Sequence, residues 1–371
     1  MQDTMRAARI HPGEHTFRIE EVPVPQLEDG DVLVQVKATG LTRGVLSLWR
    51  SRGRMRVLPT ILGYETAGVV AKIGPGVTSV NEGDRVRVHP VLSCHNCYYC
   101  RTDLEPMCPA VSVMGGAVYS DQAMPLYQKY HNGGLAEYIK VPAWNLDPLP
   151  GAISFEVGAR IHSLAVAFHA IRIAQLNFGS TLVVNGATGG VGSAAVLCAP
   201  LFGVTRIIAI SRKAETLAVT RNLVPGLVET IATGDLLEDW EARQLLTEHI
   251  RTLNNGQGID GVVDFLPGMP NITVQSIFAM RKGGSAILAG GNYEELVFPY
   301  GRIMTNGYTI KGSNGYVRRD AQELIRLLQA RRLDPSPLIT HRFPLEEVNK
   351  AAETIWDRRG DVRFVIIHPN E

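Results

Sequence analysis

The most specific chemical signal in the sequence is a set of four cysteines within fifteen residues. Cys94, Cys97, Cys100 and Cys108 follow the spacing Cys-x2-Cys-x2-Cys-x7-Cys. Four thiolates this close together can complete a tetrahedral zinc site with no open position, which is the coordination of structural rather than catalytic zinc. An iron–sulfur cluster and four free thiols are the alternatives, although nothing else in the sequence indicates electron transfer. The spacing therefore predicts one structural zinc ion per chain.

A glycine-rich segment supplies the second signal. It reads GATGGVG over residues 186–192, and it follows a β-branched run at 181–185 and opens an apolar stretch. Glycine permits positive φ and lets the backbone approach a pyrophosphate closely, while a helix N-terminus offers free N–H groups to an anion. In this setting the segment predicts a dinucleotide-binding turn, with a strand-to-helix turn that binds no ligand as the alternative. The expected cofactor contacts are Gly186, Thr188, Gly189, Gly190, Val191 and Gly192.

The end of the next predicted strand indicates which nucleotide that turn would bind. An NAD site usually places Asp or Glu about 20 residues after the glycines, on the adenosine ribose. Ser211 lies 19 residues after Gly192, and Arg212 and Lys213 follow it with no carboxylate beside them. A ribose phosphate would accept charge-assisted hydrogen bonds from such groups. We therefore expect NADPH rather than NADH, the alternative being that Arg212 and Lys213 only form a solvated loop.

Length and composition limit the kind of protein that carries these motifs. The chain has 371 residues, is 45% hydrophobic and 20% charged, and has a net charge of +1. This length predicts two domains with sizeable cores, and the charge argues against a nucleic-acid or membrane-surface partner. No apolar run approaches the roughly 18–20 residues of a membrane span, and the first residues lack a signal-peptide core. We expect a soluble, cytoplasmic protein that acts on a small molecule.

Hydrophobic periodicity changes near Ser154. Before it, β patterns at 17–22, 31–38 and 67–73 alternate with turn clusters, which predicts an antiparallel β domain, and residues 94–132 are predicted to form an irregular surface excursion. After it, strands alternate with helical stretches, which predicts a parallel, doubly wound sheet. The predicted elements there are a helix at 154–176 capped by Ser154, strands at 181–185, 206–210, 261–265 and 285–289, one helix at 319–331 and a final strand at 362–367.

Taken in order, these motifs resemble the medium-chain dehydrogenase/reductase superfamily of the zinc alcohol dehydrogenase type. The segment GYETAGVV at 63–70 resembles that family's GHE motif, and GDRV at 83–86 resembles the turn and strand that follow it. The cysteine segment, GGLAEY at 133–138 and the glycine turn then come in the expected order. The resemblance runs through essentially the whole chain.

The resemblance implies an α/β plus β fold, with a GroES-like catalytic β domain and a Rossmann domain. The corresponding boundaries are 1–160 for the catalytic domain with its structural zinc lobe at 94–108, 161–305 for the NADP-binding domain, and 306–371 for a return segment that completes the catalytic domain. The resemblance also implies a cleft between the domains, a homo-oligomer (dimer or tetramer), and cofactor contacts from Leu266, Ala289 and Arg363.

The departures from the family pattern concern the catalytic zinc. The three positions that match its usual ligands are Thr42, Tyr64 and His162. A hydroxyl coordinates zinc well only after losing its proton, so this set predicts a site without catalytic metal. The family's proton-relay hydroxyl corresponds to Gly44. A metal held by His162 and Glu65 is the alternative, and an ion pair from Glu65 to Arg363 is expected instead.

Without a Lewis acid, the acceptor of the hydride must itself be electron-poor. The sequence therefore predicts an NADPH-dependent reductase of a conjugated C=C or iminium-like bond. Tyr64, Thr42 and His162 would surround the acceptor oxygen, with Tyr64, or His162 in its charged form, as proton donor; filling of the former metal pocket is the alternative role. An alcohol dehydrogenase or carbonyl reductase with an unusual active site and a non-catalytic NADPH-binding protein are the competing functions.

A locally basic segment lies near the first of these positions. Arg43, Arg50, Arg52, Arg54 and Arg56 place five arginines within fourteen residues. They could steer an anionic substrate or the cofactor phosphates, or they could form a solvated loop. The aromatic residues that could line the cleft are Trp49, Tyr119, Tyr127 and Tyr130.

Overall fold

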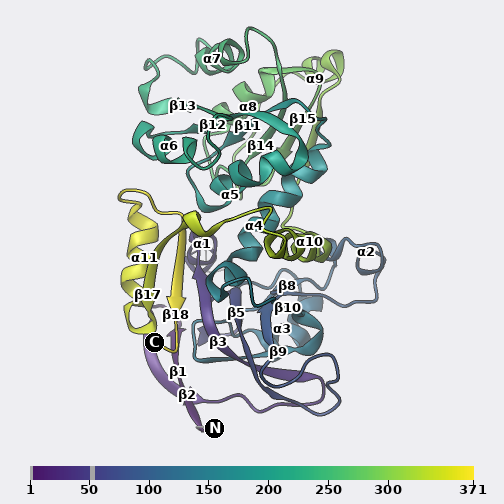
Figure 1. Cartoon of the computed structure of the whole chain (residues 1–371), viewed down its shortest axis with the longest axis vertical. Coiled ribbons are helices and arrows are strands. Elements are labelled where there is room, and N and C mark those ends of the chain that lie inside the picture. Colours follow the sequence, from purple (N-terminus) through teal and green to yellow (C-terminus); the bar gives the residue numbers. More distant parts are fainter. Residues whose placement is uncertain (1–2, 51–54) are drawn as a thin grey trace. The chain divides into compact units, whose positions relative to one another are not determined.

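The structure is a computed structural model of the chain, and it describes residues 3–50 and 55–371. The chain divides into two compact units, which are described separately (Figure 1). Unit 1 combines Met1–His162 with Val317–Glu371, and unit 2 is Ser163–Tyr316. The first division falls inside helix α4 (Phe155–Ala174).

Unit 1 is built on a seven-stranded sheet with the order β10-β6-β5-β3-β18-β17, in which β9 also pairs with β3. The bounds are β3 Asp31–Leu41, β5 Glu65–Ile73, β6 Arg85–Val88, β9 Tyr138–Pro142, β10 Leu146–Pro148, β17 Ile339–Pro344 and β18 Phe364–His368. All pairs are antiparallel except β17 with β18. The tail joins this sheet because β18 pairs with β3, Ile366 opposite Gly40.

Two smaller sheets complete the β structure of unit 1. One has the order β2-β1-β4, from β1 Thr4–Ile10, β2 Arg18–Pro23 and β4 Thr60–Ile61, and the other pairs β7 Val91–Leu92 with β8 Ser112–Val113. The strands predicted at 17–22, 31–38 and 67–73 are confirmed as β2, β3 and β5. Strand β3 is buried along nearly its whole length, because apolar clusters cover both of its faces.

The helices of unit 1 differ from the sequence expectation. The segment predicted to be irregular contains α2 (Tyr98–Arg101) and α3 (Met124–Tyr130), and after α10 (Arg318–Gln329) the chain forms a second helix, α11 (Val348–Asp357). Helix α11 buries Val348, Ala351 and Ile355 on one stripe, a short helical period that was not recognised in the sequence. Tyr127 and Tyr130 of α3 are fully buried core residues, so the expectation that they line a cleft is wrong.

Unit 2 is a parallel sheet of six strands in the order β13-β12-β11-β14-β15-β16. Their bounds are β11 Ser180–Asn185, β12 Val204–Ser211, β13 Val228–Ala232, β14 Ile259–Asp264, β15 Met280–Leu288 and β16 Thr309–Gly312. Helices lie on both sides of this sheet (Figure 1), namely α5 Gly190–Cys198, α6 Ala214–Arg221, α7 Leu245–Leu253, α8 Pro270–Phe278 and α9 Tyr300–Asn306. This is the doubly wound dinucleotide-binding order, which confirms the predicted fold class.

Helix α4 carries two residues of the candidate site, Arg160 and His162. The predicted cap is confirmed, because the Ser154 hydroxyl accepts a 3.2 Å hydrogen bond from the backbone N–H of Val157. Capping of this kind satisfies an N–H that has no partner within the helix. None of the described helices has both the length and the apolar character of a membrane span.

Candidate functional site

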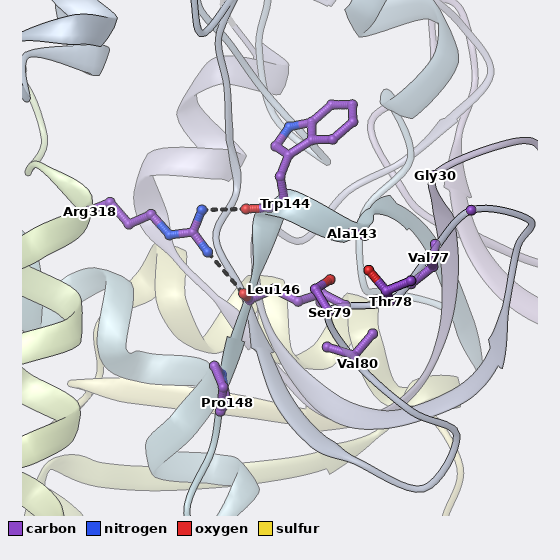
Figure 2. Close-up of a pocket in the computed structure, with 11 residues that line it drawn as sticks. Gly30, Val77, Thr78, Ser79, Val80, Ala143, Trp144, Leu146, Pro148 and Arg318 are labelled. Atoms are coloured by element: carbon purple, nitrogen blue, oxygen red, sulfur yellow. Dashed lines mark hydrogen bonds between the residues drawn. The ribbon is translucent and has the colours of Figure 1, made fainter.

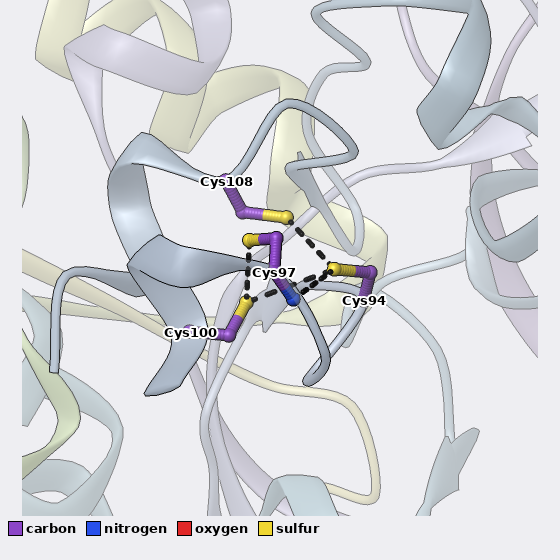
Figure 3. A group of neighbouring side chains, drawn as sticks. All are labelled: Cys94, Cys97, Cys100 and Cys108. Atoms are coloured by element: carbon purple, nitrogen blue, oxygen red, sulfur yellow. Dashed lines mark hydrogen bonds between the residues drawn. The ribbon is translucent and has the colours of Figure 1, made fainter. Parts of the chain in front are cut away.

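The four cysteines converge on one point in the loop that contains α2 (Figure 3). The Sγ–Sγ distances are 3.5 Å for Cys97 with Cys100, 3.6 Å for Cys94 with Cys108 and 3.9 Å for Cys94 with Cys100. Four sulfurs at about 2.3 Å from a tetrahedral zinc lie about 3.8 Å from one another, whereas a disulfide joins sulfurs at about 2.05 Å. The spacing of the sulfurs therefore fits one zinc ion.

Hydrogen bonds to the Cys94 sulfur favour the thiolate form, which binds a cation. Backbone N–H groups of Asn96 and Cys97 point at the Cys94 sulfur and lower the pKa of its thiol to about 6. Cys94 is therefore largely thiolate at neutral pH, the form that binds zinc. Burial has the opposite effect on Cys108 and raises its pKa to about 12, so metal binding there would release a proton.

The loop is fixed to the sheet by Glu105, which follows the third cysteine. Its Oε1 lies 3.1 Å from Nε2 of His89 and accepts a 2.9 Å hydrogen bond from the backbone N–H of Arg318. Nδ1 of His89 lies 3.1 Å from the Arg87 guanidinium, which can only donate. His89 must therefore accept at Nδ1 and donate from Nε2 to Glu105. Burial lowers the pKa of His89 and keeps it in this neutral form.

A second polar group forms at Tyr64, which lies between β4 and β5. Its hydroxyl is 3.0 Å from Oγ1 of Thr42, and Thr42 also accepts a 3.2 Å hydrogen bond from the backbone N–H of Val45 at the start of α1 (Arg43–Arg50). The His162 ring packs against the Tyr64 ring with centroids 4.9 Å apart. The structure thus brings together the three residues proposed to take part in catalysis, which we call the Tyr64 pocket.

The Tyr64 hydroxyl occupies space left by a missing side chain. A Cβ on Gly44 would lie 3.1 Å from the Tyr64 oxygen and 3.6 Å from Oγ1 of Thr42. A Cβ on Gly116 would lie 3.3 Å from Cδ1 of the same tyrosine. Two glycines therefore make room for the phenol.

Burial sets the charge states in this pocket. It raises the pKa of Tyr64 well above its usual value, and the nearby Glu65 carboxylate adds to the effect. Burial likewise lowers the pKa of His162 well below 6.5, with the positive charges of Arg87 and Arg160 acting in the same direction. Tyr64 is therefore a protonated phenol and His162 a neutral imidazole at neutral pH. The expectation that His162 acts in its charged form is corrected accordingly.

Glu65 has a partner that was not anticipated from the sequence. Its Oε2 lies 2.8 Å from Nη1 of Arg160, and the side chains of both residues are almost inaccessible, at 1% and 3% exposure. The pairing of Glu65 with Arg363 stays a prediction, and Nε of Arg363 lies 2.7 Å from Asp361. No periodic or motif signal pointed to Arg160, which lies 95 positions from Glu65 in the chain.

The side chains of the Tyr64 pocket do not form a usual zinc ligand set. Within residues 3–50 and 55–371, only one group of three or more His, Cys, Asp and Glu side chains converges closely enough for a metal, and it is the cysteine group. The Thr42 and Tyr64 hydroxyls are hydrogen-bonded to each other, and the phenol would have to ionise against its raised pKa in order to coordinate. These residues do not fit the family's second zinc ion.

In unit 2, the glycine turn links β11 to α5. Gly186 has a φ of +73°, and a Cβ on Gly192 would lie 2.2 Å from the Gly186 carbonyl oxygen. No residue other than glycine fits at position 192 without moving the backbone. The turn ends at the first residue of α5, Gly190, whose N-terminal N–H groups are suited to a pyrophosphate. This geometry fits a nicotinamide dinucleotide.

The other predicted cofactor contacts of unit 2 lie at the carboxyl ends of neighbouring strands. Ser211 ends β12, and its hydroxyl is 2.7 Å from that of Thr188 in the glycine turn. Leu266 follows β14, with its Cδ2 3.3 Å from where a Cβ on Gly186 would stand, and Ala289 follows β15. Arg212 and Lys213 are exposed at the start of α6. Ligands of this fold bind at such strand ends.

Sequence reasoning missed a buried network beneath the turn. Asn185, the last residue of β11, donates a 2.8 Å hydrogen bond to Asp264, which also accepts one of 2.7 Å from Thr273 and one of 2.9 Å from the backbone N–H of Leu266. Burial raises the pKa of Asp264. The network connects the ends of β11 and β14. The sequence signal that could have predicted it is an Asn and an Asp, each the last residue of a buried strand.

The basic segment is only partly described. Arg52 and Arg54 lie outside the described residues. The guanidinium of Arg50 stacks on Trp356 at 3.5 Å from the ring centroid, with Arg43 at 5.0 Å, and Arg56 pairs with Asp121. These contacts indicate that the arginines pack against the fold.

The two aromatic residues that remain from the sequence expectation have different environments. Trp49 packs on Phe17, with ring centroids 5.0 Å apart, and Tyr119 is 46% exposed. Tyr119 is also close enough to Tyr64 to contribute to its raised pKa.

An open pocket of about 490 Å³ lies elsewhere on unit 1 (Figure 2). Trp144 and Arg318 border it, together with the turn that carries Thr78 and Ser79. Figure 2 shows the Arg318 guanidinium turned onto the carbonyl oxygens of Trp144 and Leu146. None of the predicted site residues lines this pocket.

Comparisons with known proteins match both units. Residues 28–151 match the family model for the alcohol dehydrogenase GroES-like domain, and residues 190–330 match that for the zinc-binding dehydrogenase. A probable D-xylulose reductase A of Aspergillus clavatus is 31% identical over 358 residues, covering 94% of this chain and 93% of the relative.

Solved structures agree with these matches. A thermostable alcohol dehydrogenase from Pyrobaculum aerophilum superposes with a TM-score of 0.82 at 27% identity, over 99% of this chain and 100% of that one. An alcohol dehydrogenase from Thermus sp. ATN1 gives a TM-score of 0.84 at 26% identity, over 98% and 99%. The segments matched by the two family models contain Thr42, Tyr64 and the helical part of the glycine turn, and His162 lies between the two segments.

Proposed function

The chain belongs to the medium-chain dehydrogenase/reductase superfamily, whose members are nicotinamide-dependent oxidoreductases, and from this premise we propose that it is an NADPH-dependent reductase without a catalytic zinc ion. Its acceptor would be a small molecule with an activated double bond, such as an enone, an enal or an iminium-like centre. The observation that carries this proposal is the hydrogen bond between Thr42 and Tyr64, at two positions where the family has zinc ligands.

The ligand chemistry of the Tyr64 pocket favours an activated acceptor. Zinc promotes carbonyl and alcohol chemistry by polarising the substrate oxygen. A protonated phenol and a neutral imidazole can donate hydrogen bonds, but they supply no full positive charge at the substrate oxygen. An acceptor that is already polarised by conjugation needs less electrostatic stabilisation from the protein, because the negative charge that develops on hydride transfer is delocalised onto the carbonyl oxygen.

The reaction balances with one hydride and one proton. NADPH, when bound, supplies the hydride, which carries two electrons. The β-carbon of the acceptor would gain this hydride and the α-carbon would gain a proton from water, so that the C=C bond becomes a single bond and NADPH becomes NADP⁺. The proposed role of Tyr64 is to donate a hydrogen bond to the acceptor oxygen while negative charge develops there.

Thr42 and His162 would hold Tyr64 in place. Thr42 already accepts a hydrogen bond from the backbone N–H of Val45, so it can donate its own hydroxyl proton to the Tyr64 oxygen across the 3.0 Å contact. This direction would leave the Tyr64 proton available for the acceptor oxygen. The His162 ring limits the rotation of the phenol by packing against it. A single-step donor of this kind typically contributes about 10²–10⁴ in rate.

The preference for NADPH rests on the end of β12. Ser211 is held by Thr188, and the exposed Arg212 and Lys213 follow it without a carboxylate between them. The guanidinium of Arg212 is the group proposed to bind the ribose phosphate. Arg363 is proposed to contribute to the cofactor phosphates as well.

A second candidate function follows from the names of the relatives. Because the Aspergillus clavatus relative is called a probable D-xylulose reductase, reduction of a ketose or another simple carbonyl is the competing reaction. It would require the Tyr64 pocket to polarise an unactivated carbonyl by hydrogen bonding alone, or to bind a metal through an unusual set of ligands. A non-catalytic NADPH-binding role would leave both activities absent.

The deciding experiment combines metal analysis with a panel of acceptors. The purified protein is expected to contain one zinc ion per chain. It should reduce enones, enals, quinones or iminium compounds with NADPH, and it should reduce them more slowly with NADH. Two zinc ions per chain together with turnover of D-xylulose would instead establish the carbonyl reductase. Bound NADPH without turnover of any acceptor would support the non-catalytic alternative.

We also propose that the protein is a homo-oligomer in a reducing compartment such as the cytosol. Four large apolar side chains of unit 2 between positions 293 and 304 are 64–82% exposed, namely Tyr293, Val297, Tyr300 and Met304. Strand β16 is the last strand of its sheet and pairs only with β15 among the described strands. Light scattering should give the mass of a dimer or tetramer, whereas a monomer at micromolar concentration would contradict this proposal.

A further inference from the structure

A buried ion pair lies next to the Tyr64 pocket and has no role in the proposed reaction. Glu65 follows Tyr64 directly in the chain, and Arg160 precedes His162 by two residues on α4. Their side chains meet at 2.8 Å with 1% and 3% exposure. The pair is thus attached, through short backbone segments, to two of the three positions where the family holds its second zinc ion.

The surrounding structure is shaped to accept the Arg160 guanidinium. It lies 4.1 Å above the centroid of the Phe364 ring on β18. A Cβ on Gly40 would lie 2.4 Å from Nη1 of Arg160 and 3.0 Å from Oε2 of Glu65. Gly40 pairs with Glu65 across β3 and β5, so only the absence of a side chain at position 40 leaves room for the ion pair.

Because Glu65 is paired with Arg160, its carboxylate is not available to bind a metal ion. Glu65 is the acidic residue that, with His162, was the alternative metal site in the sequence. Its carboxylate now neutralises a guanidinium, which cannot be deprotonated at any working pH. A divalent cation beside this pair would meet no net negative charge, and it would have to displace the guanidinium to reach the carboxylate in a weakly screened environment.

We propose that Arg160 is a positioning residue that excludes metal from the Tyr64 pocket, by withdrawing the Glu65 carboxylate from the possible ligands and by cancelling its negative charge. This inference rests on the proposed function, in which no metal acts at this pocket. It goes further by naming the residue that keeps the pocket free of metal. The replacement of zinc ligands by the hydroxyls of Thr42 and Tyr64 is then only part of the reason why the pocket binds no metal.

The test creates a possible metal site and asks whether Arg160 blocks it. Tyr64→His places a second imidazole beside His162 and Glu65, and two histidines with one carboxylate are an established zinc ligand set. Full-length Y64H, Y64H/R160Q, Y64H/R160M and Y64H/R160K are loaded with Co²⁺, and bound metal and visible d–d absorption are measured. Y64H/R342Q is the matched control, since Arg342 pairs with Glu156 at the surface of the same unit.

Y64H, Y64H/R160K and Y64H/R342Q are expected to bind one ion per chain, at the cysteines. Y64H/R160Q or Y64H/R160M should bind two, with new absorption from a site containing nitrogen and oxygen ligands. The two neutral replacements protect against a folding failure, because Gln keeps a hydrogen bond to Glu65 whereas Met does not. Circular dichroism and thermal melting identify the folded variants.

Two results would overturn the inference. One is a second ion in Y64H with Arg160 intact, and the other is a single ion in a folded Y64H/R160Q or Y64H/R160M. Failure of the proposed function is a separate outcome, because it would show as a second metal ion in the unaltered chain.

Discussion

Two regions of unit 1, the cysteine loop and the Tyr64 pocket, are proposed to match the two metal sites of zinc alcohol dehydrogenases, and they differ in how their side chains are paired. In the cysteine loop the sulfurs lie 3.5–3.9 Å apart, and backbone N–H groups keep Cys94 largely ionised. In the Tyr64 pocket the hydroxyls of Thr42 and Tyr64 bond to each other, and Arg160 holds the nearest carboxylate. The first set of side chains is arranged for a cation, whereas the second set is hydrogen-bonded and ion-paired among its own members.

The contrast shows that the stability of the fold and its chemistry depend on separate sites. A site with four thiolates leaves no open position and contributes to folding, so it can persist whatever reaction the protein catalyses. A site with an open coordination position determines the reaction. Its residues can change during evolution while the cysteine loop is retained. The following experiments test this contrast, beginning with the largest expected effect.

Cys97→Ser should remove the metal from the cysteine loop. Three thiolates and a hydroxyl bind zinc far more weakly, so we expect zinc to fall from one per chain to near zero and the melting temperature to fall by roughly 10 °C or more. Atomic absorption and differential scanning calorimetry measure both. Cys198→Ala is the control, because Cys198 is buried in α5 and belongs to unit 2. A C97S protein that keeps its full zinc content would show that the loop is not the metal site.

Tyr64→Phe should impair the Tyr64 pocket without affecting the cysteine loop. Loss of the phenolic donor is expected to lower kcat/KM for the best acceptor by roughly 10²-fold, with the zinc content and the melting temperature nearly unchanged. Tyr98→Phe, at an exposed position of the cysteine loop, should have no effect on the rate. A less than twofold change in Y64F would mean that Tyr64 only fills space.

Gly44→Ala should disturb the same hydroxyl more gently. The new Cβ would lie 3.1 Å from the Tyr64 oxygen, so the phenol must move by a few tenths of an ångström. We expect kcat/KM to fall by roughly fivefold, equivalent to about 1 kcal/mol, without loss of stability, because alanine favours the helix α1. Gly151→Ala, where a Cβ meets open space, is the control. An unchanged rate in G44A would argue against a positioned Tyr64 hydroxyl.

The value of kcat/KM should depend only weakly on pH, because of the charge states in the Tyr64 pocket. The pKa of His162 lies well below 6.5 and that of Tyr64 lies above 10, so neither group changes its charge between pH 6.5 and 9. We expect kcat/KM to vary by less than about twofold in this range. Acid should instead release the zinc, because protons compete for the thiolates. A bell-shaped profile centred near pH 7 that disappears in H162N would contradict the assigned charge states.

The parts of this account that the sequence predicted are those encoded by local spacing. The cysteine spacing, the glycine turn and the strand-to-helix alternation each lie within one short segment, and the matches in both units confirm the family resemblance. Strand β13 and helix α11 were not predicted, because their apolar periods are short and interrupted by polar residues.

The parts that could not be predicted depend on contacts between distant segments. The pairing of Glu65 with Arg160 requires the register of α4 against β5 and the clearance at Gly40. The neutral state of His162 follows from burial, which residue type does not reveal. The stacking of Arg50 on Trp356 likewise joins α1 to α11 across more than 300 positions.

The central claim is that the chain carries one metal site and works without the second. The most direct measurement is a crystal structure of the zinc-replete protein with NADPH, with diffraction recorded at the zinc absorption edge. We predict one anomalous peak per chain, surrounded by Cys94, Cys97, Cys100 and Cys108. A second peak coordinated by His162 in the Tyr64 pocket would contradict the claim.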